Sequence, residues 1–293
     1  RARSVQPRGS PARYPSFMAA PTPPPPPAAE LRPRLDLALA AAREAGRLTF
    51  DYFNQSSLAI EDKADGSPVT AADRAAERRL RELIAAAFPD DAILGEEFGE
   101  HPGSTPYRWI LDPIDGTRSF IHGVPLYGTL VAVEDLRTGE AVVGVIHMPA
   151  LHGETVYAAR GLGAWHARGD AAPVPARVST VATLAGSMYV TTSLDYFSMN
   201  NASQVMAAMR QACKSSRGWS DCYGHVLIAT GRAEVATELQ IRVWDVAATQ
   251  VIVEEAGGAF SDWAGERTIH APRALVSNGL VHAEALAITR AAR

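Results

Sequence analysis

The pattern of apolar and polar positions predicts two helices in the first hundred residues. Apolar side chains recur at helical spacing from Leu35 to Phe53, and again from Thr70 to about Phe88, where Pro89 ends the pattern. Thr70 is a good N-cap residue. Asp73 lies three residues later, where its carboxylate completes a capping-box-like pair.

Short β-rich runs predict strands between and after these helices. Two of them, Leu126 to Glu134 and Ala141 to Met148, flank a turn at Thr138-Gly139 and predict an antiparallel hairpin. The other strands expected in this half are 58–62, 92–95, 109–111, 155–158 and 163–166, and turn residues predict loops at 63–68 and 171–176.

The second half of the chain again mixes strands with helices. Strands are expected at 187–191, 233–237 and 274–277, and helices at 202–213, 221–230, 244–255 and 281–291. Gly257-Gly258 is a strong signal for the end of the third of these helices. We therefore predict an α+β fold, or a layered α/β/α/β/α arrangement, as one domain of residues 31–293 with lobes of about 31–180 and 181–293.

Residues 1–30 differ from the rest in composition. They contain a proline run from Pro23 to Pro27, several arginines and no acid before Glu30. Proline runs form polyproline II helices and do not join a core. One interpretation is an expression tag or vector-derived leader before a natural start near Met18. The other is an Arg-rich, acid-poor transit peptide. The lack of an amphipathic pattern favours the first, and both exclude the segment from the fold.

Composition and charge exclude several classes of function. The chain of 293 residues is 47% hydrophobic and carries a net charge of −4, which gives no indication of a nucleic-acid surface. No apolar run reaches the roughly 18 residues that span a bilayer. Cys213 and Cys222 are expected to be reduced thiols. We expect a soluble cytoplasmic protein, or an organellar one if residues 1–30 are a transit peptide.

The stretch from Trp109 to Arg118 carries the strongest chemical signal. Three apolar residues are followed by Asp112 and Asp115, held close on either side of a proline. Two such acids repel each other unless a cation or proton lies between them, and oxygen ligands without a His/Cys cluster favour Mg²⁺ over zinc. Gly116-Thr117 then opens a short helix, whose free N–H groups favour an anion.

Three further acids lie where strands end or helices begin: Asp73, Glu96 and Asp245. Any one of them alone is more often a helix cap than a ligand. The histidines lack ligand spacing and are interpreted as surface or core residues. Metal, phosphate cradle and spare acids together predict phosphate-ester hydrolysis.

Four segments resemble elements of the inositol monophosphatase family and occur in the family's order. Asp112-Pro-Ile-Asp-Gly-Thr117 resembles its first signature, and Trp244-Asp-Val-Ala-Ala248 followed by Glu255-Ala-Gly-Gly258 resembles the second. Leu94-Gly-Glu-Glu97 is similar to the family's Gly-Glu-Glu element. Asp65-Gly-Ser-Pro-Val-Thr-Ala-Ala-Asp73 is similar to its N-terminal loop and helix start.

The resemblance implies a five-layer αβαβα sandwich, usually a homodimer, that uses two or three Mg²⁺ per site and is often inhibited by Li⁺. The implied metal ligands are Glu96, Asp112 and the Ile114 carbonyl for the first ion, Asp112, Asp115 and Asp245 for the second, and Glu96 with Asp73 for the third. The resemblance also implies that Thr117 and Asp73 orient the attacking water, with Glu96 among the catalytic acids. Gly116 and Thr117 would hold the phosphate, and Lys63 would close over the site.

Other segments resemble the histidinol-phosphatase branch of the family: Ser119 to Thr129, Arg217 to Gly224, Ala229 to Glu234 and Gly257 to Trp263. This branch implies hydrolysis of L-histidinol phosphate, a small-molecule ester, in histidine biosynthesis. The alternatives are an inositol-1-phosphate or broad sugar-phosphate phosphatase and, more remotely, a catalytically silent metal-binding regulator.

Two acids bear on the choice of substrate. Glu238 matches the family position that contacts the alcohol part of the substrate, and Asp221 aligns near a position that is small in inositol-specific members. Two carboxylates suit a cationic amine and imidazole better than a neutral polyol. Asp221 can also cap the helix that it opens, alone or in addition. Arg217 and Trp219 are expected to shape this pocket or a subunit contact.

Overall fold

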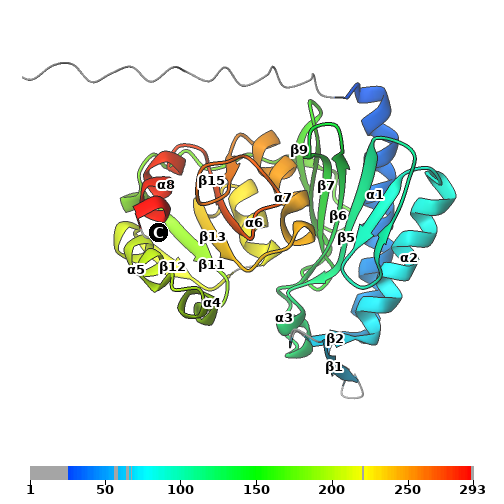
Figure 1. Cartoon of the computed structure of the whole chain (residues 1–293), viewed down its shortest axis with the longest axis horizontal. Coiled ribbons are helices and arrows are strands. Elements are labelled where there is room, and N and C mark those ends of the chain that lie inside the picture. Colours follow the sequence, from blue (N-terminus) through cyan, green and yellow to red (C-terminus); the bar gives the residue numbers. More distant parts are fainter. Residues whose placement is uncertain (1–25, 56–58, 64–65, 67, 220, 292–293) are drawn as a thin grey trace, which may run out of the picture.

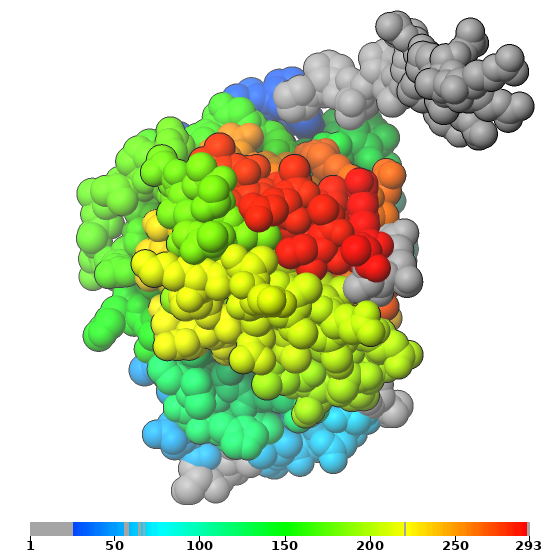
Figure 2. All heavy atoms as spheres, turned by 90° about the vertical axis from the view of Figure 1, so that its left-hand side faces the viewer, coloured from blue at the N-terminus to red at the C-terminus, as the bar shows by residue number. Residues whose placement is uncertain are grey.

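The computed structural model describes residues 26–55, 59–63, 66, 68–219 and 221–291. These residues form five layers (Figure 1), which confirms the predicted αβαβα arrangement. Helices α1 and α2 cover one face of a large sheet, α6 and α7 lie between that sheet and a smaller one, and α4, α5 and α8 cover the far side. Figure 2 shows this far side, with α8 in red above the yellow-green α4–α5 segment.

The helices begin and end as follows: α1 Ala28–Tyr52, α2 Ala71–Ala87, α3 Thr117–Ile121, α4 Leu194–Met199, α5 Ser203–Ala212, α6 Cys222–Ala229, α7 Val243–Glu255 and α8 His282–Ala291, with a 3₁₀ turn at Leu184–Gly186. No helix in the described ranges is both long and apolar enough to cross a membrane.

The large sheet has the strand order β10-β9-β8-β7-β6-β5-β3-β4 and is antiparallel except for the β3–β5 pair. Its strands are β3 Ala92–Gly95, β4 Gly99–His101, β5 Tyr107–Asp115, β6 Gly128–Asp135, β7 Glu140–Met148, β8 Glu154–Ala159, β9 Gly163–Ala167 and β10 Val174–Pro175. The predicted hairpin is confirmed as β6–β7. A separate antiparallel pair joins β1 Ile60–Asp62 to β2 Pro68–Thr70.

The smaller sheet has the order β12-β11-β13-β15-β14, in which β11 pairs parallel to β12 and β13. Its strands are β11 Met188–Thr191, β12 Ser215–Arg217, β13 Val235–Leu239, β14 Ala259–Ser261 and β15 Arg273–Ser277. The faces of both sheets are apolar. Trp109 of β5 lies in the same core cluster as Leu80 of α2, whereas Val226 of α6 and Val251 of α7 belong to the core between the sheets. Each such burial stabilises the fold by about 1.5–3 kcal/mol.

The structure corrects several predicted boundaries. Helix α1 begins at Ala28, before the predicted start at Leu35 and inside the segment that was excluded, because Leu31 extends the buried stripe of the helix by one turn. Strand β5 continues to Asp115 instead of ending at Leu111. Strand β10 lies in the predicted loop 171–176.

The sequence pattern missed β2, β4, β12, β14, α4 and the 3₁₀ turn, which are too short to show a period. Most of the predicted leader (residues 1–25), Leu58 of the predicted strand 58–62 and part of the predicted loop 63–68 lie outside the described residues.

Candidate active site

The end of β5 carries two buried carboxylates. Ile110 packs in the core between the sheets and Leu111 under α1 and α2, so alternation points Asp112 toward the α6–α7 layer. The pairing of β5 with β6 then shifts between Asp112 and Asp115. Pro113, which has no N–H for the ladder, lies within this irregular step. The local fold therefore places both acids at one edge of the sheet.

Asp245 reaches the same edge from the first turn of α7. Its carboxylate accepts a hydrogen bond from the backbone N–H of Arg242 at 2.7 Å, so it also caps the helix. One oxygen atom each of Asp112, Asp115 and Asp245 lie within 4.8 Å of one another. Three carboxylate oxygens at this spacing can share a hard divalent cation.

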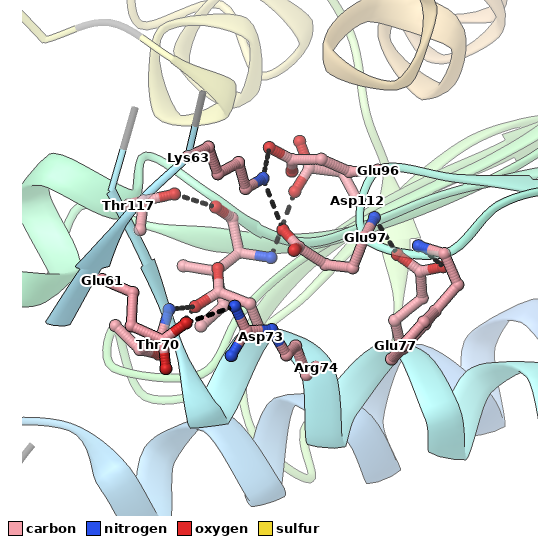
Figure 3. A network of polar contacts seen from close by, with 12 residues as sticks. Glu61, Lys63, Thr70, Asp73, Arg74, Glu77, Glu96, Glu97, Asp112 and Thr117 are labelled. Carbon is pink, nitrogen blue, oxygen red and sulfur yellow. Dashed lines mark hydrogen bonds and ion pairs between the residues drawn. The ribbon is translucent and has the colours of Figure 1, made fainter. Parts of the chain in front are cut away.

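Asp73 completes the predicted capping box of α2. Its Oδ2 accepts hydrogen bonds from the N–H and the hydroxyl of Thr70, at 2.8 and 2.6 Å. Figure 3 shows Asp73 on α2, below Asp112 and Thr117 in that view. The capping interpretation is thus confirmed for Asp73, and for Asp245 the same carboxylate serves both the cap and the acid cluster.

Lys63 joins Glu96 to Glu97 beside this cluster (Figure 3). Its Nζ lies 2.8 Å from Glu96 Oε1 and 2.6 Å from Glu97 Oε1. Burial disfavours the ammonium, but the two carboxylates outweigh it and raise the pKa of Lys63. Burial raises the pKa of Glu96 even though Lys63 opposes the shift. One predicted metal ligand is therefore held in an ion pair with the lysine predicted to close over the site.

Glu77 is a part of this arrangement that the sequence analysis missed. Its buried carboxylate accepts hydrogen bonds from the backbone N–H groups of Glu97 and Phe98, at 2.7 and 3.2 Å. A Cβ at Gly95 would lie 2.1 Å from Glu77 Oε1, so any larger residue there would displace the Glu77 carboxylate. Glu77 thus shapes the turn that carries Glu96. The available signal was an acid within the apolar stripe of the predicted helix.

The Gly116-Thr117 step follows directly on β5. Gly116 has φ 88°, in the left-handed region, and a Cβ there would lie 3.0 Å from the Leu126 carbonyl oxygen. The Thr117 hydroxyl donates to the Ile114 carbonyl at 3.1 Å. This carbonyl, predicted as a metal ligand, keeps a second lone pair.

Burial raises the pKa of the acids in the cluster. The pKa values of Asp112 and Asp115 lie well above the usual range, first through burial and then through neighbouring carboxylates. Burial also raises the pKa of Asp245 to about 7 and that of Asp73 to about 6. Within the described ranges, no lysine or arginine forms an ion pair with Asp112, Asp115 or Asp245. A bound cation would relieve their mutual repulsion.

Asp221 lies beside this cluster, and the alternative that its side chain caps α6 is wrong. The residue has φ 55°, and its side chain makes no capping hydrogen bond to α6. Its carboxylate instead accepts a hydrogen bond from the Thr192 hydroxyl at 3.4 Å. A Cβ on Gly116 would lie 3.4 Å from Asp221 Oδ2. Burial raises the pKa of Asp221 to about 6.

The backbone N–H of the next residue, Cys222, donates to Asp115 Oδ2. This contact, which the sequence analysis also missed, ties the start of α6 to the end of β5.

Glu238 approaches from β13 in the smaller sheet. Ala236 packs in the core between the sheets, so alternation turns Glu238 to the same side. Its side chain is buried, and burial followed by the charge of Asp221 raises its pKa well above the usual range. The charge of Asp221 thus acts on Glu238 from a different element, and the predicted role of the two acids in the substrate pocket stays a prediction.

Arg217 ends β12 and is exposed. Its guanidinium donates to the Ser216 carbonyl at 2.7 Å and lies 6.0 Å from the centre of the Trp219 ring. These two contacts do not join Arg217 to the acids, so its role in the substrate pocket stays a prediction.

Comparisons with known proteins agree with this geometry. The sequence model of the family described as "Inositol monophosphatase family" matches residues 30–293. The chain is 48% identical over 247 residues to a histidinol-phosphatase of Chlorobaculum parvum, covering 84% of this chain and 92% of the relative. It is 38% identical over 252 residues to a histidinol-phosphatase of Mycobacterium tuberculosis, covering 86% and 96%. A solved Thermotoga maritima IMPase superposes with a TM-score of 0.78 at 31% identity, covering 89% and 98%.

Proposed function

The chain belongs to the inositol monophosphatase family, and from that premise we propose that it hydrolyses L-histidinol phosphate to histidinol and phosphate. It is a phosphoric monoester hydrolase. The single observation that carries the proposal is the cluster of Asp112, Asp115 and Asp245, of which the first two are buried, flanked by the further acids Asp221 and Glu238. The proposed reaction is a step of histidine biosynthesis.

The donor set fits Mg²⁺. All the proposed ligand atoms are oxygens, from Glu96, Asp112, the Ile114 carbonyl, Asp115 and Asp245, and Asp73 offers another carboxylate at the edge. When bound, Mg²⁺ supplies the positive charge that polarises the phosphoryl group and a nucleophilic water. Asp112 interacts with Glu96 on one side and Asp245 on the other, which supports a ligand shared by two ions.

The remaining residues position the reactants. We expect the backbone N–H groups of Gly116 and Thr117 to hold the phosphate, because they follow the acids at the start of α3. Thr117 and Asp73 orient the attacking water for in-line displacement at phosphorus. Lys63 is expected to exchange its contact with Glu96 for the phosphate when a cation takes up that carboxylate.

Charge selects the leaving group in this proposal. Asp221 and Glu238 place two carboxylates next to the phosphate position, and their Coulomb field favours an ester whose alcohol carries an ammonium and an imidazole. A neutral polyol brings no charge that matches these two carboxylates.

Phosphate release from L-histidinol phosphate and from inositol 1-phosphate, each with Mg²⁺ and with EDTA, tests the proposal. We expect Mg²⁺-dependent turnover with a higher kcat/KM on histidinol phosphate. Asp221→Ala should lower kcat/KM on histidinol phosphate about 10- to 100-fold more than on inositol phosphate. If the wild type prefers inositol phosphate, the proposed substrate is wrong. If it releases phosphate from neither ester, the proposed enzymatic role is overturned.

Two features that the resemblance implies stay predictions, namely two or three Mg²⁺ per site and a homodimer, and so does the cytoplasmic location expected from composition. Metal titration by calorimetry and sedimentation of the purified chain test the first two.

A further inference from the structure

Two buried polar atoms, one on α6 and one on β13, lie near each other without a hydrogen bond. His225 Nε2 on α6 lies 3.9 Å from Glu238 Oε1 on β13. Both atoms are buried, and in the described part of the chain neither has another hydrogen-bond partner. Leaving such groups unpaired costs about 1–3 kcal/mol each. An arrangement that persists at this cost needs an explanation.

A third side chain fixes the orientation of the imidazole. His225 Nδ1 lies 2.9 Å from the hydroxyl oxygen of Thr249, on α7. Thr249 is fully buried and His225 is 2% exposed, so water does not compete for this contact. When the Thr249 hydroxyl donates to Nδ1, the imidazole proton must lie on Nε2, where it points at Glu238.

Burial keeps this imidazole neutral. It lowers the pKa of His225 to about 4, so at neutral pH the ring carries a single proton and acts as a hydrogen-bond donor without a positive charge. The neutral ring therefore adds no positive charge that would compete with a cationic ligand for Glu238.

We propose that His225 is a positioning residue, held by Thr249, that donates its Nε2–H to Glu238 and so aims an ionised carboxylate at the cationic alcohol part of the substrate. This inference rests on the proposed function and deepens it. A movement of about 1 Å would close the 3.9 Å gap to hydrogen-bond length. A donor on Oε1 favours the charged form of Glu238, which the nearby Asp221 and burial disfavour.

Substrate discrimination tests the inference. The measured quantity is the ratio of kcat/KM on L-histidinol phosphate to kcat/KM on inositol 1-phosphate, for the full chain with Mg²⁺. Thr249→Val keeps the side-chain volume but removes the hydroxyl, and His225→Leu removes the donor. Each should lower the ratio about tenfold, since a hydrogen bond to a charged group is lost. His225→Gln, which restores an N–H donor, should recover part of the ratio.

A matched control lies on the same helix. Ile228→Val removes one buried methyl group from α6 and touches no polar group of this chain of contacts, so it should leave the ratio unchanged. Equal losses on both substrates in folded Thr249→Val and His225→Leu would assign the two residues to packing alone and overturn the inference. A wild type that does not prefer histidinol phosphate overturns the proposed substrate first, and that result is visible before any variant is compared.

The tautomer gives a second measurement that needs no turnover. Nitrogen-15 NMR of histidine-labelled protein reports which ring nitrogen carries the proton, and the His225→Gln spectrum identifies the His225 signal. We expect an Nε2–H tautomer in the wild type and its loss in Thr249→Val. An Nδ1–H tautomer in the wild type would overturn the inference even if the variants prove unstable.

Discussion

The carboxylates at the two ends of strand β5 differ in whether an arginine pairs with them. Beside its start lies Asp91, whose two oxygens accept hydrogen bonds from Arg34 at 2.9 and 2.9 Å, from the Thr105 hydroxyl at 2.6 Å and from Trp109 Nε1 at 3.0 Å. At its end, Asp112 and the other acids of the cluster lack any such arginine in the described ranges.

Buried acids elsewhere resemble the first case. Glu134 is paired with Arg108 at 2.7 Å, and Glu154 with Arg232 at 2.6 Å. A buried charge that is paired within the chain can hold elements together, because its desolvation is offset by the partner. A cluster left unpaired is stable only with protons or a cation, so the difference locates the ligand-binding end of the strand.

The largest effect should come from breaking the unpaired end. Asp112→Asn removes a ligand that two ions share, so kcat should fall at least about a thousandfold. The stability of the same variant in EDTA should stay unchanged or rise, because one buried repulsive charge is gone. Phosphate release and thermal unfolding check both expectations, and turnover within tenfold of the wild type would contradict the proposed metal site.

The paired end should give the converse result. Asp91→Asn leaves the Arg34 charge without its partner and should lower the free energy of unfolding by about 3–5 kcal/mol. The kcat of the folded fraction should stay within about twofold of the wild type, because Asp91 lies at the other end of β5. Urea unfolding, with activity assays at urea concentrations below the transition, tests this. If Asp91→Asn lost activity but kept its full stability, the two ends of β5 would not differ as proposed.

Mg²⁺ should stabilise the folded protein only by binding to the acid cluster at the end of β5. At a free concentration 100 times its dissociation constant, it should add about 2.7 kcal/mol to the free energy of unfolding. Asp91→Asn should keep this increment and Asp112→Asn should lose most of it. Thermal unfolding across an Mg²⁺ titration provides the measurement, and an equal increment in Asp112→Asn would place the ion elsewhere.

In EDTA, stability should fall as the pH rises from about 4 to about 7. The folded-state pKa of Asp245 is raised to about 7 and that of Asp221 to about 6, against about 3.8 unfolded, so the native state binds more protons in this window. Each pKa unit is worth on the order of 1.4 kcal/mol.

Buried His147 acts in the opposite direction, because burial lowers its pKa to about 4. Its contribution to the stability of the protein is lost as the pH falls from about 6.5. Comparing wild type with Asp112→Asn at each pH cancels this contribution. A slope that does not differ between the two proteins would show that the acid cluster does not control it.

The smallest effect tests how Glu96 is positioned. Glu77→Gln turns an amide donor toward backbone N–H groups that now donate to a carboxylate, so the turn at 95–98 should shift and kcat/KM should fall about tenfold. Glu82→Gln on the exposed side of α2 is the control and should leave kcat/KM unchanged. Equal values for the two variants would remove Glu77 from the positioning of the site.

Much of the fold followed from local patterns. Helical spacing predicted α2 and α7 within one residue at each end, and the capping box of Thr70 and Asp73 formed as expected because its members lie within one turn. The start of α1 and the end of β5 were misplaced, since buried Leu31 and the irregular pairing around Pro113 depend on packing against the sheet.

Residue types at strand ends and helix starts were therefore enough to single out Asp112, Asp115 and Asp245, which the fold brings together, and, through the resemblance, to indicate the family of the chain. Only the tertiary structure decided which acids remain unpaired, that Asp221 does not cap its helix, and that His225, Thr249 and Glu238 converge from three elements. Periodicity and caps depend on neighbours within a turn, whereas charge compensation depends on which side chains the layers bring together.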